Sequence, residues 1–263
     1  MTRITLTRLR EMKRTGEKIA CLTAYDASFA ALLEEACVEV LLVGDSLGMA
    51  IQGHQSTLQV RLNDMIYHTA NVRRGQKRAL ILADLPFLSY STPVQALGNA
   101  GRVMQSGAQM VKLEGGAWLA ETVRLLDARG IPVCAHLGLM PQSIHKLGGY
   151  RVQARSQGDA ERLLEEARIL EQAGAALLVV ECVPRALAAT VTQSLNIPVI
   201  GIGAGSKCDG QVLVLYDMLG ISGKIPSFCR NFARSGNDVP SALRAYVQAV
   251  KSGEFPATEH GFD

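Results

Sequence analysis

The sequence predicts an α/β fold, a barrel of eight parallel strands in which most strands are followed by a helix, with an extra helix at the N-terminus. Short apolar runs without polar alternation recur along the chain, as expected for strands buried on both faces. Amphipathic helical segments separate most of these runs. The chain has 263 residues, close to the roughly 250 of a (β/α)8 or TIM barrel. Because the sequence shows neither a repeat nor a linker, we expect residues 1–263 to form a single domain.

The predicted strands are the apolar runs themselves. They cover Lys18–Tyr25, Val40–Gly48 (apolar over its first part), Ala79–Leu85, Met110–Glu114, Val133–Leu137, Ala176–Glu181, Pro198–Ile202 and Val212–Tyr216. Helices are predicted from apolar residues at helical spacing. They cover Thr5–Gly16, Asp26–Cys37, Asn63–Arg74, Pro93–Gly107, a segment after Gly116 that ends at Arg129, Asp159–Ala173, Pro184–Leu195 and Ser241–Lys251.

Local signals set several helix ends. Thr5 and Asp26 are predicted side-chain caps, and Gly16 ends the first helix. Pro93 begins a helix at a position where its missing N–H costs nothing. Since the N-terminal helix precedes the first strand, we expect it to close one end of the barrel.

Three segments fit the regular pattern poorly. Gly138–Gln157 is a long stretch with three glycines and Pro141, and such loops are often functional, so it is a candidate lid. Only Ser206–Gln211 separate the last two strands, too few for a crossover helix. Either that helix is reduced to a turn or the predicted position of strand eight is wrong. The tail after Gly253 is expected to be an exposed arm or a subunit contact.

Composition excludes several classes of function. The net charge is +3 and the basic residues are scattered, so no nucleic-acid surface is expected. The basic start at residues 8–14 has no apolar signal-peptide core after it. No window approaches the roughly 20 apolar residues of a membrane helix. The six cysteines lie far apart without a C-x-x-C pair, which indicates reduced, buried thiols in the cytoplasm and argues against a cysteine zinc site.

Four predicted strands end in an acidic residue: Asp45, Asp84, Glu114 and Glu181. Barrel active sites lie at the carboxyl ends of the strands, so the first three acids should lie side by side. Carboxylates that converge in a partly dry site repel each other unless protons or a cation compensate them. Mg²⁺, which prefers oxygen ligands, would bind Asp45 and Asp84 directly and Glu114 directly or through water. The alternative, that each acid caps the helix after its strand, stays open.

Two further side chains are candidate substrate contacts. Lys112 lies two residues before Glu114, so both project to the same side of the strand. Its ammonium can bind an anionic substrate or a developing enolate, or form a structural ion pair with Glu114. Ser46 and the adjacent backbone amides can hold a substrate carboxylate, although its residue type fits a helix cap equally well.

A proton-transfer group is predicted across the barrel from the metal acids. Glu181, held apart from a cation, can keep a raised pKa and act as general base. His136, at the end of strand five, is a candidate for sharing that role or orienting the substrate; a structural role is the alternative. The I-G-I-G-A-G run ending at Gly205 is either a phosphate cradle or a tight strand-end turn.

These segments resemble one known family. L-T-A-Y-D, V-G-D-S-L-G, Y-H-T-A-N-V-R-R-G, A-D-L-P-F, V-K-L-E-G-G, H-L-G-L, P-Q-S, G-G-Y-R-V-Q, E-C-V-P and I-P-V-I-G-I-G-A-G occur in this order, and the chain is similar to the ketopantoate hydroxymethyltransferases. The resemblance implies a barrel of the phosphoenolpyruvate/pyruvate superfamily, usually a decamer of two stacked pentamers in the cytoplasm. It also implies one Mg²⁺ per subunit and 5,10-methylenetetrahydrofolate as co-substrate.

The resemblance also assigns roles to residues. The metal ligands fall on Asp45, Asp84 and Glu114, the oxo-acid contacts on Asp45, Ser46, Asp84 and Lys112, and the proton acceptor on Glu181. The implied reaction transfers a hydroxymethyl group to 3-methyl-2-oxobutanoate through a magnesium-stabilised enolate, which attacks a folate iminium. Three departures touch the rim: Tyr216 before Asp217, L-M-P-Q-S around Met140, and Ser206–Cys208.

Two other readings of the sequence are weighed against this one. A C–C lyase or mutase of 2-oxo acids would use a similar metal set but usually carries a catalytic cysteine loop, which this sequence lacks. A non-catalytic ring-forming or ligand-binding homologue would be favoured by loss of the acids, and all are present.

Overall fold

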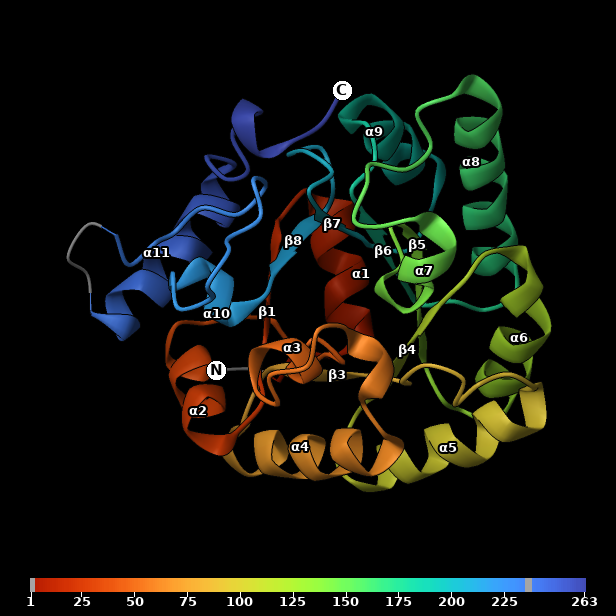
Figure 1. The fold of residues 1–263 in the computed structure, drawn as a ribbon, viewed down its shortest axis with the longest axis horizontal. Coiled ribbons are helices and arrows are strands. Elements are labelled where there is room, and N and C mark those ends of the chain that lie inside the picture. The colour runs from red at the N-terminus through yellow and green to blue at the C-terminus, as the bar shows by residue number, and fades with distance from the viewer. Residues whose placement is uncertain (1–2, 235–237) are drawn as a thin grey trace.

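The computed structural model describes residues 3–234 and 238–263. Eight strands, all parallel, close into one barrel in the order β1 to β8 (Figure 1). The strands are β1 (Ile19–Thr23), β2 (Val40–Val43), β3 (Leu80–Asp84), β4 (Met110–Glu114), β5 (Val133–Gly138), β6 (Leu177–Glu181), β7 (Val199–Ile202) and β8 (Gly210–Leu213). The predicted (β/α)8 barrel is confirmed.

Helices surround the barrel in Figure 1. The α-helices are α1 (Leu6–Thr15), α2 (Ala27–Glu35), α3 (Leu47–Ala50), α4 (Leu62–Gly75), α5 (Pro93–Gln105), α6 (Ala120–Ala128), α7 (Ile144–Leu147), α8 (Gln157–Gln172), α9 (Arg185–Ser194), α10 (Leu215–Met218) and α11 (Val239–Ser252). Short 3₁₀ turns are η1 (Thr57–Gln59), η2 (Ala117–Leu119), η3 (Pro141–Ser143) and η4 (Thr258–His260). None of the helices in the described ranges is long and apolar enough to cross a membrane.

The extra N-terminal helix closes one end of the barrel, as predicted. Leu9 and Met12 of α1 are buried in the same apolar cluster as the inward-facing residues Ile19 and Met110. The Thr5 hydroxyl caps the helix by accepting the Arg8 N–H at 3.2 Å. The amino end of the barrel is therefore an apolar plug, which leaves the carboxyl end for polar groups.

Strand eight was predicted too late in the chain. β8 ends at Leu213, and the following residues form α10 rather than strand. The error has a physical cause, because a short apolar run looks the same in a strand and in a buried helical turn. The connection between β7 and β8 contains no helix. Instead, α11 covers this part of the barrel, where the Tyr246 hydroxyl donates to the Cys21 and Gln211 carbonyls at 2.8 and 3.0 Å.

The C-terminal tail packs on its own chain, so the prediction of an exposed arm is wrong for much of it. Phe255 is buried against Phe232 and Tyr246. The Arg185 guanidinium pairs with Asp263 through two 2.7 Å hydrogen bonds, and the Arg185 N–H donates to the Phe262 carbonyl at 2.9 Å. The tail thus packs against the start of α9, which follows β6. A subunit contact through this segment stays a prediction.

Gly138 is the point where β5 and β6 approach too closely for a side chain. Its φ is +91°, and a Cβ there would lie 2.2 Å from the Glu181 carbonyl oxygen. We expect Gly138→Ala to lower the free energy of unfolding by at least the roughly 1–3 kcal/mol of a strained backbone, measured by denaturant titration. Gly98→Ala is the control: Gly98 is an exposed α5 residue with free space around it, so this change should stabilise by about 0.5–1 kcal/mol. Equal effects of the two changes would contradict this account.

Candidate active site

The barrel register brings the predicted site residues together at the carboxyl ends of the strands. Asp84 of β3 lies opposite Lys112 of β4, and Glu114 lies opposite His136 of β5. The period of two that places Met110 in the barrel interior also turns Lys112 and Glu114 inward. Apolar residues fill the lower part of the barrel and polar residues face its mouth.

Asp45, Asp84 and Glu114 form a buried acid cluster. The Lys112 ammonium lies among these three carboxylates. Its Nζ lies 3.0 Å from Asp84 Oδ1 and 3.6 Å from Glu114 Oε1. Burial opposes the lysine charge, but the attraction of Asp84, Glu114 and Asp45 outweighs it and raises the Lys112 pKa well above its usual value. Lys112 therefore stays charged, and the predicted ion pair with Glu114 is accompanied by a shorter one with Asp84.

The acid cluster carries more negative charge than one lysine compensates. Burial and the repulsion of Asp84 and Glu114 raise the pKa of Asp45 well above its usual value, against the opposing effects of Lys112 and Gln142. Burial also raises the pKa of Glu114, although Lys112 and His136 oppose the rise. The Asp45 N–H donates to Asp84 Oδ2 at 3.0 Å, so the first two acids are immediate neighbours. This excess of buried negative charge favours a bound cation.

The alternative that the acids are helix caps is wrong. The α3 helix is preceded by Ser46, which makes no side-chain capping bond, and α5 is capped by Thr92. Gly116 precedes η2. The Ser46 hydroxyl instead forms a 2.9 Å hydrogen bond with the Tyr25 hydroxyl, so the alternative role of Ser46 as a side-chain cap is also wrong.

Glu181 of β6 lies near the Glu114 end of the acid cluster. His136 stands between the two: its Nε2 lies 3.3 Å from Glu181 Oε2, and its Nδ1 lies 3.7 Å from Glu114 Oε1. In the closed barrel β6 lies opposite β2, so Glu181 is across the barrel from Asp45, as expected, and only two strands from Glu114 on β4. The His136 side chain is 3% exposed and that of Glu181 is 12% exposed, so of the two the glutamate has more access to the barrel mouth.

Sequence reasoning missed two residues of the site. Gln142, in the loop between β5 and α8, donates from Nε2 to Asp45 Oδ2 at 2.8 Å. Tyr90, in the loop after β3, accepts the Glu114 N–H at 3.3 Å and bonds to the Gln142 amide oxygen. The position of Gln142 inside the candidate lid was the available signal.

Metal binding depends on whether these donors suit a hard cation. Within the described ranges, no three His, Cys, Asp or Glu side chains stand in an arrangement that would hold a metal ion by themselves. Mg²⁺ typically takes only one or two carboxylates and completes its shell with water and substrate oxygens. In the part of the chain that the structure describes, Asp84 Oδ1 is buried without a hydrogen bond and is paired only with the Lys112 ammonium in its ion pair. The donor set therefore fits Mg²⁺ through Asp45 and Asp84, with Glu114 nearby.

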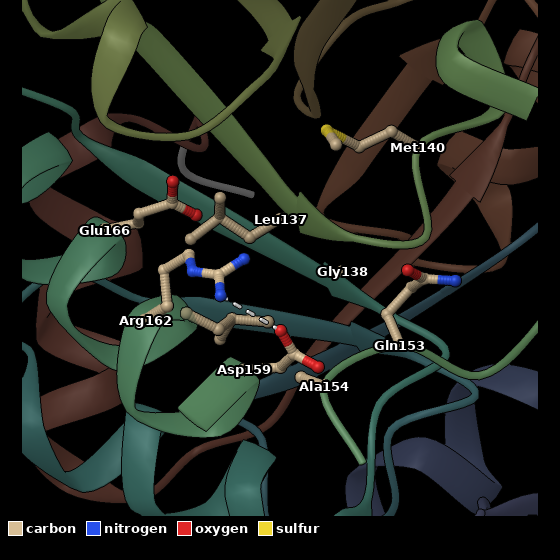
Figure 2. Close-up of a pocket in the computed structure, with 9 residues that line it drawn as sticks. Leu137, Gly138, Met140, Gln153, Ala154, Asp159, Arg162 and Glu166 are labelled. Atoms are coloured by element: carbon tan, nitrogen blue, oxygen red, sulfur yellow. Dashed lines mark ion pairs between the residues drawn. The ribbon is translucent and has the colours of Figure 1, made fainter. Parts of the chain in front are cut away.

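A cavity of about 230 Å³ is lined by residues outside this cluster, and Figure 2 shows its lining. Leu137 and Gly138 of β5 line it together with Arg162 and Glu166 of α8. Arg162 pairs with Asp159 at 3.2 Å on its edge, as the dashed line in Figure 2 marks. None of the acid cluster lines this cavity, so it is not the site of the proposed chemistry.

The glycine run after β7 is a packed turn. A Cβ on Gly205 would lie 2.7 Å from the Arg185 Cβ, and one on Gly203 would lie 3.0 Å from the Phe228 ring. The Gln211 amide donates to the Gly205 carbonyl at 3.0 Å. These contacts favour the strand-end turn over the phosphate cradle.

Comparison with known proteins decides the family. A family model described as ketopantoate hydroxymethyltransferase matches residues 3–258. A relative from Nitrosococcus oceani named 3-methyl-2-oxobutanoate hydroxymethyltransferase is 63% identical over 98% of this chain and 99% of its own length. The chain belongs to the ketopantoate hydroxymethyltransferase family. A second relative, 3-methyl-2-oxobutanoate hydroxymethyltransferase 2 from Pseudomonas entomophila, is 60% identical over 100% of the chain and 99% of its length.

Solved structures share the fold of this ketopantoate hydroxymethyltransferase family member at low identity. A phosphonopyruvate hydrolase in complex with oxalate and Mg²⁺ has a TM-score of 0.62 at 12% identity, covering 99% of this chain and 93% of that one. A 2,3-dimethylmalate lyase of the PEP mutase/isocitrate lyase superfamily has a TM-score of 0.59 at 18% identity, covering 100% and 91%. These matches show that the barrel fold is shared.

Of the three predicted departures from the family pattern, Tyr216 and Met140 lie toward the carboxyl end of the barrel, outside the acid cluster. The expectation that Ser206–Cys208 touches the rim is wrong, because the Lys18 ammonium before β1 donates to the Ser206 and Cys208 carbonyls at 3.3 and 2.5 Å, at the amino end of the barrel. The Tyr216 ring packs against Tyr25 and Phe29 at centroid distances of 5.9 and 6.0 Å. Since Tyr25 bonds to Ser46, Tyr216 lies behind a predicted substrate contact. Met140 lines the cavity in Figure 2, and Cys208 is buried.

The raised pKa values of Asp45 and Glu114 predict how the metal-free protein responds to pH. The ordinary pKa values are 3.8 and 4.5, so the folded state binds these protons more tightly than the unfolded state does. The two protons therefore stabilise the folded state. This contribution to the free energy of unfolding is fully present below pH values equal to the ordinary pKa values and is lost as the pH rises through the folded-state pKa values. In EDTA we expect wild type to lose melting temperature relative to Asp45→Asn as the pH rises above about 4. If the melting temperatures of the two proteins changed with pH in parallel across that range, the prediction would be contradicted.

Proposed function

We propose that this protein transfers a hydroxymethyl group from 5,10-methylenetetrahydrofolate to 3-methyl-2-oxobutanoate and forms 2-dehydropantoate, the first committed step of pantothenate synthesis. The observation that carries the proposal is the 63% identity, over almost the full length of both chains, to a relative named for this reaction. The buried acid cluster, with a lysine inside it and a carboxylate beside it, supplies groups that such chemistry needs.

Substrate binding is assigned to the polar groups at the mouth of the barrel. Ser46 and the neighbouring backbone amides would hold the carboxylate of the oxo acid. The Lys112 ammonium, 3.0 Å from Asp84, would stabilise negative charge that develops on the 2-oxo oxygen. His136 would orient the substrate or the base from its position between Glu114 and Glu181.

Proton transfer is assigned to Glu181. Its carboxylate would remove the hydrogen from carbon 3 of 3-methyl-2-oxobutanoate, which leaves an enolate. The enolate carbon then forms a C–C bond with the methylene carbon of the folate iminium, and water completes the hydroxymethyl group as tetrahydrofolate leaves. His136, with Nε2 3.3 Å from Glu181 Oε2, would hold the base in place for this step.

The proposed reaction also uses a divalent cation. Asp45 and Asp84 would hold one Mg²⁺ per subunit with Glu114 directly or through water, and the ion would polarise the 2-oxo group as a Lewis acid. We also propose, from family resemblance alone, that the chain is one catalytic domain that assembles into a cytoplasmic homo-oligomer of two pentamers. Neither nucleic acid nor membrane is a proposed partner.

The test is a hydroxymethyl-transfer assay with both substrates, run with Mg²⁺ and with EDTA. We expect 2-dehydropantoate to form only with a divalent cation, because the cation compensates the developing enolate charge. Full turnover in EDTA would overturn the metal-dependent mechanism. Folded protein without any turnover would favour a non-catalytic homologue. Cleavage of a branched 2-oxo or 2-hydroxy acid, without transfer, would favour a lyase or mutase.

A further inference from the structure

Gln142 reaches the acid cluster from a loop rather than from a barrel strand. The loop runs from Leu139 to Ser156 between β5 and α8 and carries the short helices η3 and α7. Gln142 lies in η3 and is 5% exposed, whereas its neighbours on α7, His145 and Lys146, are exposed. The Gln142 side chain is therefore buried at the barrel mouth, whereas other side chains of the loop face solvent.

The polar groups of Gln142 are fully used. Its Nε2 donates to Asp45 Oδ2 at 2.8 Å and to the Leu85 carbonyl at 3.0 Å, and its backbone N–H donates to Glu114 Oε2 at 3.0 Å. Its Oε1 accepts the Tyr90 hydroxyl. A single residue thus bonds the first and the last carboxylate of the acid cluster. These bonds are neutral donors to buried anions, so they orient the carboxylates without adding charge that would repel a cation.

We propose that Gln142 is a positioning residue for the cation site: it fixes the carboxylates of Asp45 and Glu114, so the loop must be docked for a cation to bind well. This inference rests on the cation of the proposed function. A carboxylate has about four acceptor sites, and Gln142 uses one on each acid, which leaves the others for the ion. Partners that orient ligand side chains in this way typically change metal affinity by about 10–100-fold when they are removed.

Tyr90 connects this arrangement to a spectroscopic reporter. The chain contains one tryptophan, Trp118, and its ring stacks on Tyr90 with centroids 6.3 Å apart and planes within 9°. Tyr90 bonds to Gln142 through its hydroxyl. Loss of the Gln142 contact leaves that hydroxyl bonded only to the Glu114 backbone among the described residues, so Trp118 fluorescence should respond to the state of the loop.

The experiment measures Mg²⁺ affinity by calorimetry in the absence of both substrates. We expect Gln142→Ala to weaken Mg²⁺ binding by about tenfold or more and to shift Trp118 emission. Tyr90→Phe keeps the ring and removes the hydroxyl, so we expect a loss of about fivefold, the size of one hydrogen bond. Because the Tyr90 hydroxyl bonds to Gln142, the two effects are coupled, and the double variant should lose less than their product. Gln153→Ala is the control, since among the described residues that side chain bonds only to the Arg151 carbonyl in the same loop.

The outcomes separate this inference from the proposed function. Unchanged Mg²⁺ affinity in folded Gln142→Ala, with wild-type turnover intact, would overturn the inference and leave the function standing. Weakened affinity in the variants, with a wild type that shows no turnover, would support the inference and overturn the function. A wild type that binds no Mg²⁺ would overturn both. If Gln142→Ala does not fold, Gln142→Asn and Tyr90→Phe carry the test with the same expected direction.

Discussion

Replacing Glu181 by glutamine is expected to lower kcat by roughly two to four orders of magnitude, the usual contribution of a general base. In the wild type, Glu181 Oε2 lies 3.3 Å from His136 Nε2. The glutamine keeps the size and reach of this side chain, but it cannot take a proton. The reporter step is exchange of the carbon-3 hydrogen of 3-methyl-2-oxobutanoate in D₂O, followed by NMR without folate. Wild type should exchange it, and the variant should not.

The control separates loss of the base from loss of the site. Glu165→Gln changes an exposed glutamate on the outer helix α8 and should leave exchange and turnover unchanged. Glu181→Gln should still bind Mg²⁺, because Glu181 lies beside His136 rather than within the acid cluster. Exchange at the wild-type rate in Glu181→Gln would show that another group removes the proton.

The strand-end acids could be predicted because strand geometry alone places them. A strand has a period of two, so Lys112 and Glu114 had to share a face, and parallel strands deliver their last residues to one rim. The observed 3.6 Å between their charged groups follows directly from this. The same reasoning located Asp84 and Glu181 without any knowledge of which strands are neighbours.

The remaining parts of the site depend on information that periodicity does not contain. The pairing of Asp84 with Lys112, and of Glu114 with His136, is set by the stagger between strands. Gln142 and Tyr90 come from loops whose path follows tertiary packing, so neither spacing nor propensity identifies them. Strand eight failed for a related reason: its apolar run continues from β8 into α10.

Replacing Lys112 by methionine is expected to destabilise the metal-free protein by about 3–5 kcal/mol at neutral pH, the cost of leaving buried charge without its partner. Methionine has a similar length, so packing in the barrel is largely kept. The Lys112 ammonium lies 3.0 Å from Asp84 and 3.6 Å from Glu114, and its removal leaves these carboxylates without that compensating charge. Turnover should fall as well, since the group that stabilises the enolate oxygen is gone.

Two conditions should restore stability to Lys112→Met, and each tests the electrostatic cause. Denaturant unfolding in EDTA at pH 7 and pH 5 should show a smaller loss at the lower pH, because the raised pKa values of Asp45 and Glu114 favour protonation there. Mg²⁺ should recover part of the loss at pH 7, since a cation then compensates the same oxygens. Lys146→Met, on the exposed face of α7, is the control and should change stability little. If Lys112→Met lost the same stability at both pH values and with Mg²⁺, packing rather than charge would explain the effect, and the acid cluster would not need a cation.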